Sequence, residues 1–139
     1  MVLTISRAEH MTYAAHIVAT LESVAARHGD PADAIYTELF AAHPDLESLF
    51  WLDRDDGVRR SMVQQGLECI LDYVGDRLTA PQIIAAARHH HDGYGVPADR
   101  FDAFFVAMRD AFRQIMSADW TPATDRAWNQ MLTEFATIR

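Results

Sequence analysis

Apolar residues recur along most of the chain at intervals of three and four positions, which is the spacing of amphipathic α-helices. The clearest case follows an acidic loop and predicts a helix that ends near residue 75. Its apolar positions are Val63, Leu67, Ile70, Leu71 and Val74. No stretch alternates with a period of two for long enough to predict a strand. The pattern therefore predicts an all-α fold.

Capping residues divide the first half of the pattern. Ser6 and Glu9 have the spacing of a capping box that opens a long first helix. Asp30 is placed to cap the next helix, with Pro31 in its first turn. A short element is predicted over residues 44–51, and the acidic loop that follows is read as solvated, with a mobile gate as the alternative. The second helix presents one face made of Ile35, Tyr36, Leu39 and Phe40.

The second half of the pattern is divided by prolines and a glycine. Pro81 opens a helix that Gly93 is expected to end as its C-cap glycine. Pro97 opens the next helix, and Thr121 with Pro122 opens the last one. The predicted buried positions of these two helices are Phe101, Phe104, Phe105, Met108, Phe112, Ile115, Trp128, Leu132 and Phe135. In total, about seven to eight helices are expected.

Composition and charge narrow the functional classes. We expect residues 1–139 to form a single domain, because half of the residues are hydrophobic and 23% are charged. The net charge of −8 argues against nucleic acid and anionic membranes as partners. The single cysteine, Cys69, excludes an internal disulfide and a thiolate-rich zinc site. With neither a signal peptide pattern nor an apolar span, a cytoplasmic location is expected.

Three consecutive histidines, His89, His90 and His91, are the most unusual feature of the chain. Successive helical residues are about 100° apart, so the three imidazoles cannot all bind one ion from one rigid helix. His89 is expected to be exposed. His90 lies in line with Ile83, and His91 lies in line with Ile84, so the helical period leaves both open as inward-facing ligands. The ordinary alternative is a polar surface.

Three segments resemble a known family. Tyr36 to Phe50 reads YTELFAAHPDLESLF, His91 to Val96 reads HDGYGV with Phe101 beyond it, and Asp119 to Trp128 reads DWTPATDRAW. Together and in this order they resemble bacterial single-domain globins and the globin domain of flavohaemoglobins. The resemblance implies a globin fold packed around haem b and its iron.

The resemblance also separates the histidines. It implies that His91 is the proximal iron ligand, with His90 as the alternative if this corner carries one more residue. A haem-ligating imidazole needs an acceptor for its second ring nitrogen, which fixes the tautomer. The carbonyl groups one turn back, around Ala87 and Arg88, are the expected acceptors.

Apolar residues are expected to enclose the haem. By resemblance, Phe50 stacks on the porphyrin, while Val96, Phe101 and Phe105 wall the proximal side; for Phe105, plain core packing is an equal alternative. Flavohaemoglobins carry a tyrosine where this chain has Phe101. We therefore expect no strong peroxidase-like activation of the iron.

The distal side is less sharply defined. The resemblance places Tyr36 over the iron, where its hydroxyl can donate a hydrogen bond to a gas ligand. Counting forward from Phe50 indicates Arg60 as the next distal residue, and counting back from His91 indicates Arg59. The helical stripe favours Arg59, because Val63 then lies one turn further on the inward face. A shift of one position brings in Gln64 instead, and a solvated helix face is the plain alternative for both arginines.

The resemblance implies a protein that reversibly binds dioxygen or another diatomic gas at a five-coordinate ferrous iron, and we expect a monomer or homodimer. Nitric oxide dioxygenase activity is possible only with an external reductase, because the sequence contains no flavin or nicotinamide reductase domain. A gas or redox sensor that signals through a partner protein is the second class. A haem-free interaction module is the third, and His91 together with Tyr36 and Phe50 argues against it.

Overall fold

The computed structural model describes residues 7–139, with side chains from residue 13 onward. Within this range the chain forms six α-helices and two 3-10 helices and no strand, which confirms the all-α prediction. The elements are α1 (Arg7–His28), α2 (Ala32–Ala42), η1 (Pro44–Phe50), α3 (Gly57–Val74), α4 (Ala80–Gly93), α5 (Ala98–Met116), η2 (Ser117–Asp119) and α6 (Pro122–Thr137).

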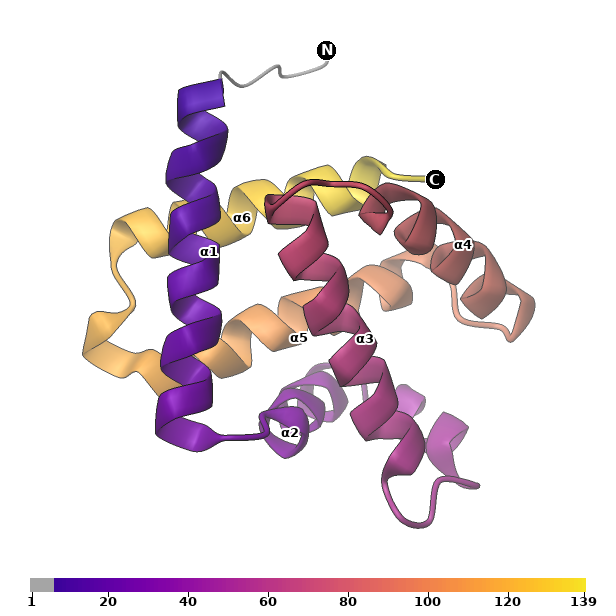
Figure 1. The fold of residues 1–139 in the computed structure, drawn as a ribbon. Coiled ribbons are helices and arrows are strands. Elements are labelled where there is room, and N and C mark those ends of the chain that lie inside the picture. The colour runs from indigo at the N-terminus through magenta and orange to yellow at the C-terminus, as the bar shows by residue number, and fades with distance from the viewer. Residues whose placement is uncertain (1–6) are drawn as a thin grey trace.

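Helix α5 lies at the centre of the molecule. Figure 1 shows α1 running across both α5 and α6, with α2 against α5 and α3 between α1 and α4. The phenylalanines of α5 and the aromatic residues of α6 fill the space between these layers. Phe112 and Trp128 are fully buried, with ring centroids 5.6 Å apart. None of the described helices is long and apolar enough to cross a membrane.

The break between α1 and α2 follows the prediction with one adjustment. Gly29 has a φ of +80°, a conformation that costs a residue without a Cβ little, and it turns the chain out of α1. Oδ1 of Asp30 accepts a hydrogen bond from the backbone N–H of Ala32, at 3.0 Å. Pro31 therefore precedes the first helical residue instead of lying inside the first turn. The expected capping box at Ser6 and Glu9 lies outside the residues whose side chains are described.

The end of α4 corrects the sequence prediction. Gly93 is the last helical residue, and Gly95, with a φ of +83°, supplies the left-handed position. The N–H of Gly95 donates to the carbonyl of Asp92 at 3.0 Å, and the N–H of Val96 donates to the carbonyl of His91 at 2.9 Å. This pair of bonds is a Schellman motif. It places His91 in the last turn of the helix.

Two positions near α3 were not anticipated from the sequence. Leu71 is 48% exposed because the buried face of α3 passes through Cys69, Ile70 and Tyr73. The acidic loop is not wholly solvated, because Asp53 is only 8% exposed. Its carboxylate accepts hydrogen bonds from two backbone N–H groups in the first turn of α3 and so acts as a cap for that helix.

Candidate functional site: the His91 and Tyr36 clusters

The helical face of α4 separates the three histidines. Ile84 is 1% exposed, whereas Ile83 is 48% exposed. His91 shares the side of Ile84 and is half-buried, while His89 and His90 are exposed. The ambiguity that the helical period left is therefore resolved in favour of His91 as the inward-facing residue.

Two neighbours hold the His91 imidazole. Its Nδ1 lies 2.7 Å from the carbonyl oxygen of Ala87, one turn earlier in α4, which is the acceptor expected from the sequence. Its ring lies 5.4 Å from the ring of Phe101, measured between centroids. With Nδ1 engaged as a donor to a carbonyl, Nε2 is the ring nitrogen that carries the lone pair available to a metal.

A second cluster of aromatic rings forms around Tyr36 in α2. The ring centroid of Tyr36 lies 5.6 Å from that of Phe40, 5.5 Å from that of Phe50 and 6.1 Å from that of Phe104. Such tilted and edge-to-face contacts are favourable beyond the apolar area that they bury. Phe104 belongs to α5, so this cluster joins α2, η1 and α5.

The hydroxyl of Tyr36 is turned toward α3. It donates a hydrogen bond to the backbone carbonyl of Arg59, at 3.1 Å. Burial raises the pKa of Tyr36 far above its ordinary value; the charge of Arg59 opposes this shift and that of Asp53 adds to it. The hydroxyl therefore stays protonated at physiological pH and acts as a donor.

The Arg59 side chain lies along the same cluster. Its guanidinium carbon is 5.2 Å from the ring centroid of Phe50, a distance at which a cation is attracted to the ring. One terminal nitrogen pairs with Asp56, and Nε lies 4.0 Å from a carboxylate oxygen of Asp53. The other two distal alternatives are exposed but lie close by: Arg60 lines a cavity together with Tyr36 and Arg59, and Gln64, which donates to Glu68, lines a second cavity.

Asp53 stabilises the first turn of α3, which carries Arg59. Its two carboxylate oxygens accept hydrogen bonds from the N–H groups of Val58 at 2.9 Å and Arg59 at 3.0 Å. Burial opposes ionisation of the carboxyl, but these two donors, the charge of Arg59 and the N–H of Gly57 outweigh it and keep the pKa of Asp53 below its usual value. Asp53 therefore caps the start of α3 and lies beside the Arg59 side chain.

Phenylalanines of α5 connect the Tyr36 and His91 clusters. Phe104 contacts Phe105 with a centroid distance of 5.3 Å, and Phe105 contacts Phe101 at 6.1 Å. Phe101 in turn contacts His91. One apolar wall thus runs along α5 from Tyr36 to His91, and both clusters face α5. Phe105 also packs against Phe135 of the core, which agrees with the alternative of plain core packing for this residue.

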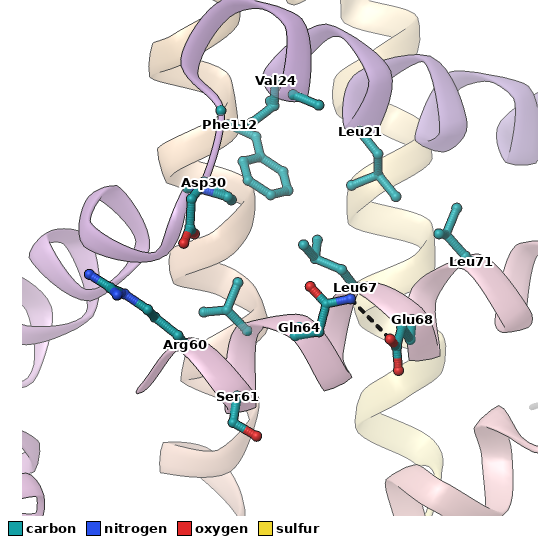
Figure 2. A pocket seen from close by; sticks show the side chains of 14 residues that line it. Leu21, Val24, Asp30, Arg60, Ser61, Gln64, Leu67, Glu68, Leu71 and Phe112 are labelled. Carbon is teal, nitrogen blue, oxygen red and sulfur yellow. Dashed lines mark hydrogen bonds between the residues drawn. The ribbon is translucent and has the colours of Figure 1, made fainter. Parts of the chain in front are cut away.

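Two cavities are lined partly by residues of α3, and His91 lines neither of them. The larger, of about 650 Å³, lies between α1, α3 and α5, and Figure 2 shows Leu67 and Phe112 pointing into it. A second, of about 580 Å³, is lined by Tyr36 and Arg59 among others. Of the predicted site residues, Val63 lines the larger cavity and is buried, and Val96 is partly buried beside the end of α4.

Sequence reasoning missed three contributors. Arg88 is 6% exposed and ion-paired with Asp102, although an arginine in a polar run reads as surface. Phe104 was expected only as core, yet its ring contacts Tyr36. Asp53 was read as part of a solvated loop. Asp53 lies outside the N-cap position of α3, which Asp56 occupies, so the usual capping pattern does not indicate it.

The other possible metal ligands in the described chain are its carboxylates, its other histidines and Cys69. In the described part of the chain, no group of three or more His, Cys, Asp or Glu side chains is arranged to hold a metal ion. Burial raises the pKa of Cys69 to about 11, so the thiol stays neutral and is a poor metal ligand. His91 is a single oriented imidazole that lies against the Phe101 ring.

Comparison with known proteins gives a match to a family model, but no significant match to a curated protein or a solved structure. A family model described as Globin matches residues 33–138, which include α2 through α6 and therefore both clusters. The helical architecture is that of the globin fold. The chain belongs to the globin family, a family of haem-binding proteins.

Proposed function

We propose that this globin holds haem b through His91 and reversibly binds dioxygen or another diatomic gas. The observation that carries the proposal is the contact between Nδ1 of His91 and the carbonyl of Ala87, at 2.7 Å. This contact favours one tautomer and leaves Nε2 as the ligand atom. A histidine that served only as polar surface would have no need of an oriented, half-buried ring beside Phe101.

The residues around His91 fit a haem. Phe101 and Val96 offer apolar surface on the side of His91, and Phe50 offers an aromatic face on the side of Tyr36. Haem held by His91 would supply an iron atom able to accept a neutral imidazole and a small gas ligand. The protein orients the imidazole, excludes water with these apolar side chains and provides a neutral hydroxyl donor.

Tyr36 is the proposed donor to the gas ligand. Its hydroxyl is protonated, is held within the Phe40 and Phe50 cluster, and has a neighbouring carbonyl as an alternative acceptor. Rotation about the phenol C–O bond redirects the proton without moving the ring. Arg59 is held on Phe50 and by Asp56, so we propose that it closes the side of the cluster and is not itself the direct donor.

The first test is the absorption spectrum of the protein in ferric, ferrous and carbon-monoxide-bound forms. We expect a histidine-ligated ferrous spectrum that converts fully with carbon monoxide in the wild type. His91→Ala should lose this spectrum. His90→Ala is the matched control, because His90 neighbours His91 in the sequence but is exposed, and it should keep the spectrum.

The outcomes separate the parts of the proposal. Loss of the spectrum in His90→Ala alone would keep the haem but transfer the ligand role to His90. If haem added to the wild type gives no ligated spectrum, gas binding at iron is excluded. Circular dichroism of each variant confirms that the helices remain, so that a lost spectrum reports on ligation.

A further inference from the structure

Arg88 is a buried arginine three residues before His91. Its guanidinium donates from Nε to the carbonyl of Ile138 at 2.9 Å, and from Nη2 to the carbonyl of Phe135 at 2.9 Å. Nη2 also donates to Oδ1 of Asp102 at 2.8 Å. The side chain thus joins α4 to α5 and to the end of α6.

The guanidinium also reaches His91 through one aromatic ring. Its carbon lies 4.7 Å from the ring centroid of Phe101, and that ring lies 5.4 Å from the His91 ring. Phe101 therefore has Arg88 and His91 as neighbours, both from α4. The Phe101 ring is thus the contact through which the guanidinium and the imidazole are connected.

The geometry of arginine makes this contact rigid. A planar guanidinium has five N–H donors in a fixed fork, so several acceptors on different elements determine its orientation. The three bonds to Ile138, Phe135 and Asp102 are all shorter than 3.0 Å. Asp102 supplies the counter-charge that a buried guanidinium needs. Removing one partner therefore loosens the others.

We propose that Arg88 is a positioning residue for the His91 imidazole: it locks the last turn of α4 against α5 and the end of α6, and so fixes the angle and tilt at which His91 is presented. This proposal rests on the proposed role of His91 as iron ligand. Because Asp102 balances the charge of Arg88, the effect is mechanical, through Phe101 and the backbone of α4.

The test is the iron–histidine stretching band in resonance Raman spectra of the ferrous haem-loaded protein. Arg88→Met and Asp102→Asn should both shift or broaden this band in the same direction, because both loosen the same contact. Arg88→Lys should restore it in part. Arg109→Met is the control, since Arg109 also links α5 to α6, through Asn129 at 2.7 Å, but donates its hydrogen bonds to Asp110 and Asn129 and not to α4.

A second readout needs no haem. In the haem-free protein, the imidazole NMR resonances of His91 should be one sharp set in the wild type and broadened in Arg88→Met. A third readout uses the haem-loaded protein: the rate at which haem passes to an acceptor protein should rise in the same variant. Asp102→Asn, which keeps the size of the side chain, and Arg88→Lys provide the test if Arg88→Met does not fold.

Three results would overturn the inference. One is an unchanged iron–histidine band and unchanged His91 resonances in folded Arg88→Met or, in its place, folded Asp102→Asn. Another is a shift of opposite sign in Arg88→Met and Asp102→Asn, which would indicate an effect of charge. A third is an equal shift in Arg109→Met. A wild type without an iron–histidine band would instead refute His91 as the ligand, so the two failures are distinguishable.

Discussion

The Tyr36 hydroxyl donates a hydrogen bond to the carbonyl of Arg59, and this bond must break before the hydroxyl can donate to a gas ligand. Its strength therefore limits the free energy that Tyr36 adds to gas binding. A hydrogen bond to a neutral carbonyl contributes about 0.5–1.5 kcal/mol net, and one to a partly charged acceptor contributes about 1.5–3 kcal/mol. A ligand that takes the proton therefore gains the difference and not the whole bond. That difference is about 1–2 kcal/mol.

Tyr36→Phe should accordingly weaken dioxygen binding about fivefold to thirtyfold, a range that follows from the difference above. Carbon monoxide is a weaker acceptor, so its affinity should change by less. The measurement is flash photolysis and stopped-flow binding of both gases. Tyr94→Phe is the control, because Tyr94 is 73% exposed. Equal affinities in wild type and Tyr36→Phe would show that the hydroxyl does not reach the ligand.

At this scale the sequence predicts side chains better than it predicts their partners. Tyr36, Phe50 and His91 were singled out because their types and spacing match a family pattern. The orientation of Arg59 could not be predicted, because its partners Asp53 and Asp56 lie in a loop whose path follows no helical period. Whether Arg59 is free or held depends on that path.

Among the elements, the connection between α3 and α4 depends on one carboxylate. Oδ2 of Asp72 in α3 accepts hydrogen bonds from the N–H groups of Thr79 at 3.0 Å and Ala80 at 2.7 Å, at the start of α4. These two donors outweigh burial and hold the pKa of Asp72 below its usual value. The helix that carries His91 is thus anchored at its start by Asp72 and near its end by Arg88.

The pH dependence follows from the lowered pKa. A carboxyl whose pKa is lower in the folded state adds stability above its unfolded pKa, which is about 3.9. This stability is complete above about pH 5 and is lost as the pH falls below about 4, toward the folded pKa. Urea unfolding at pH 7 and pH 3.5 should therefore show a smaller difference in Asp72→Asn than in the wild type.

Asp76→Asn is the control for this measurement, because Asp76 is exposed and lies in the connection between α3 and α4. Its difference between the two pH values should match that of the wild type. If Asp72→Asn also matches the wild type, the hydrogen bonds to Thr79 and Ala80 add no pH-dependent stability.

Helix number and type were predictable because the apolar period and the prolines mark them locally. The ends were less so. Gly93 and Gly95 are two residues apart, and both satisfy the rule that a glycine follows a helix. Only the backbone bonds of Asp92 and Val96 decide between them, and these depend on how far the helix extends before packing stops it.

For the whole molecule, α1 and α6 are joined by a buried polar contact. Nε1 of Trp128 donates to Oγ1 of Thr20 at 3.1 Å, and both residues are fully buried. Thr20→Val keeps the shape of the side chain but leaves the indole N–H without an acceptor. Such an unpaired buried donor costs about 1–3 kcal/mol of unfolding free energy.

Chemical denaturation measures this cost, and Thr37→Val supplies the matched control. Thr37 makes the same kind of bond to a carbonyl four residues earlier in its helix as Thr20 does, but it is exposed. The control should lose little stability. A loss in Thr20→Val no greater than in Thr37→Val would mean that the indole finds another partner.

Helix pairing was the part of the fold that residue patterns could not supply. The apolar period of a single helix is visible in the sequence, but it does not indicate which other helix packs against that face. Thr20 and Trp128 are 108 positions apart, and neither residue type on its own indicates the other. The resemblance to globins supplied the arrangement that the periodicity lacked.

The bonds of Arg88 to the end of α6 have a consequence for the order of assembly during synthesis. Ile138 follows Arg88 by 50 positions, and at about 5–20 residues per second the ribosome needs several seconds to make that stretch. Through most of this time Arg88 has Asp102 as a partner but lacks its two carbonyl acceptors, Phe135 and Ile138. We therefore expect the surroundings of His91 to be the last part of the domain to mature, so that stable capture of haem follows translation of α6 instead of accompanying translation of α4.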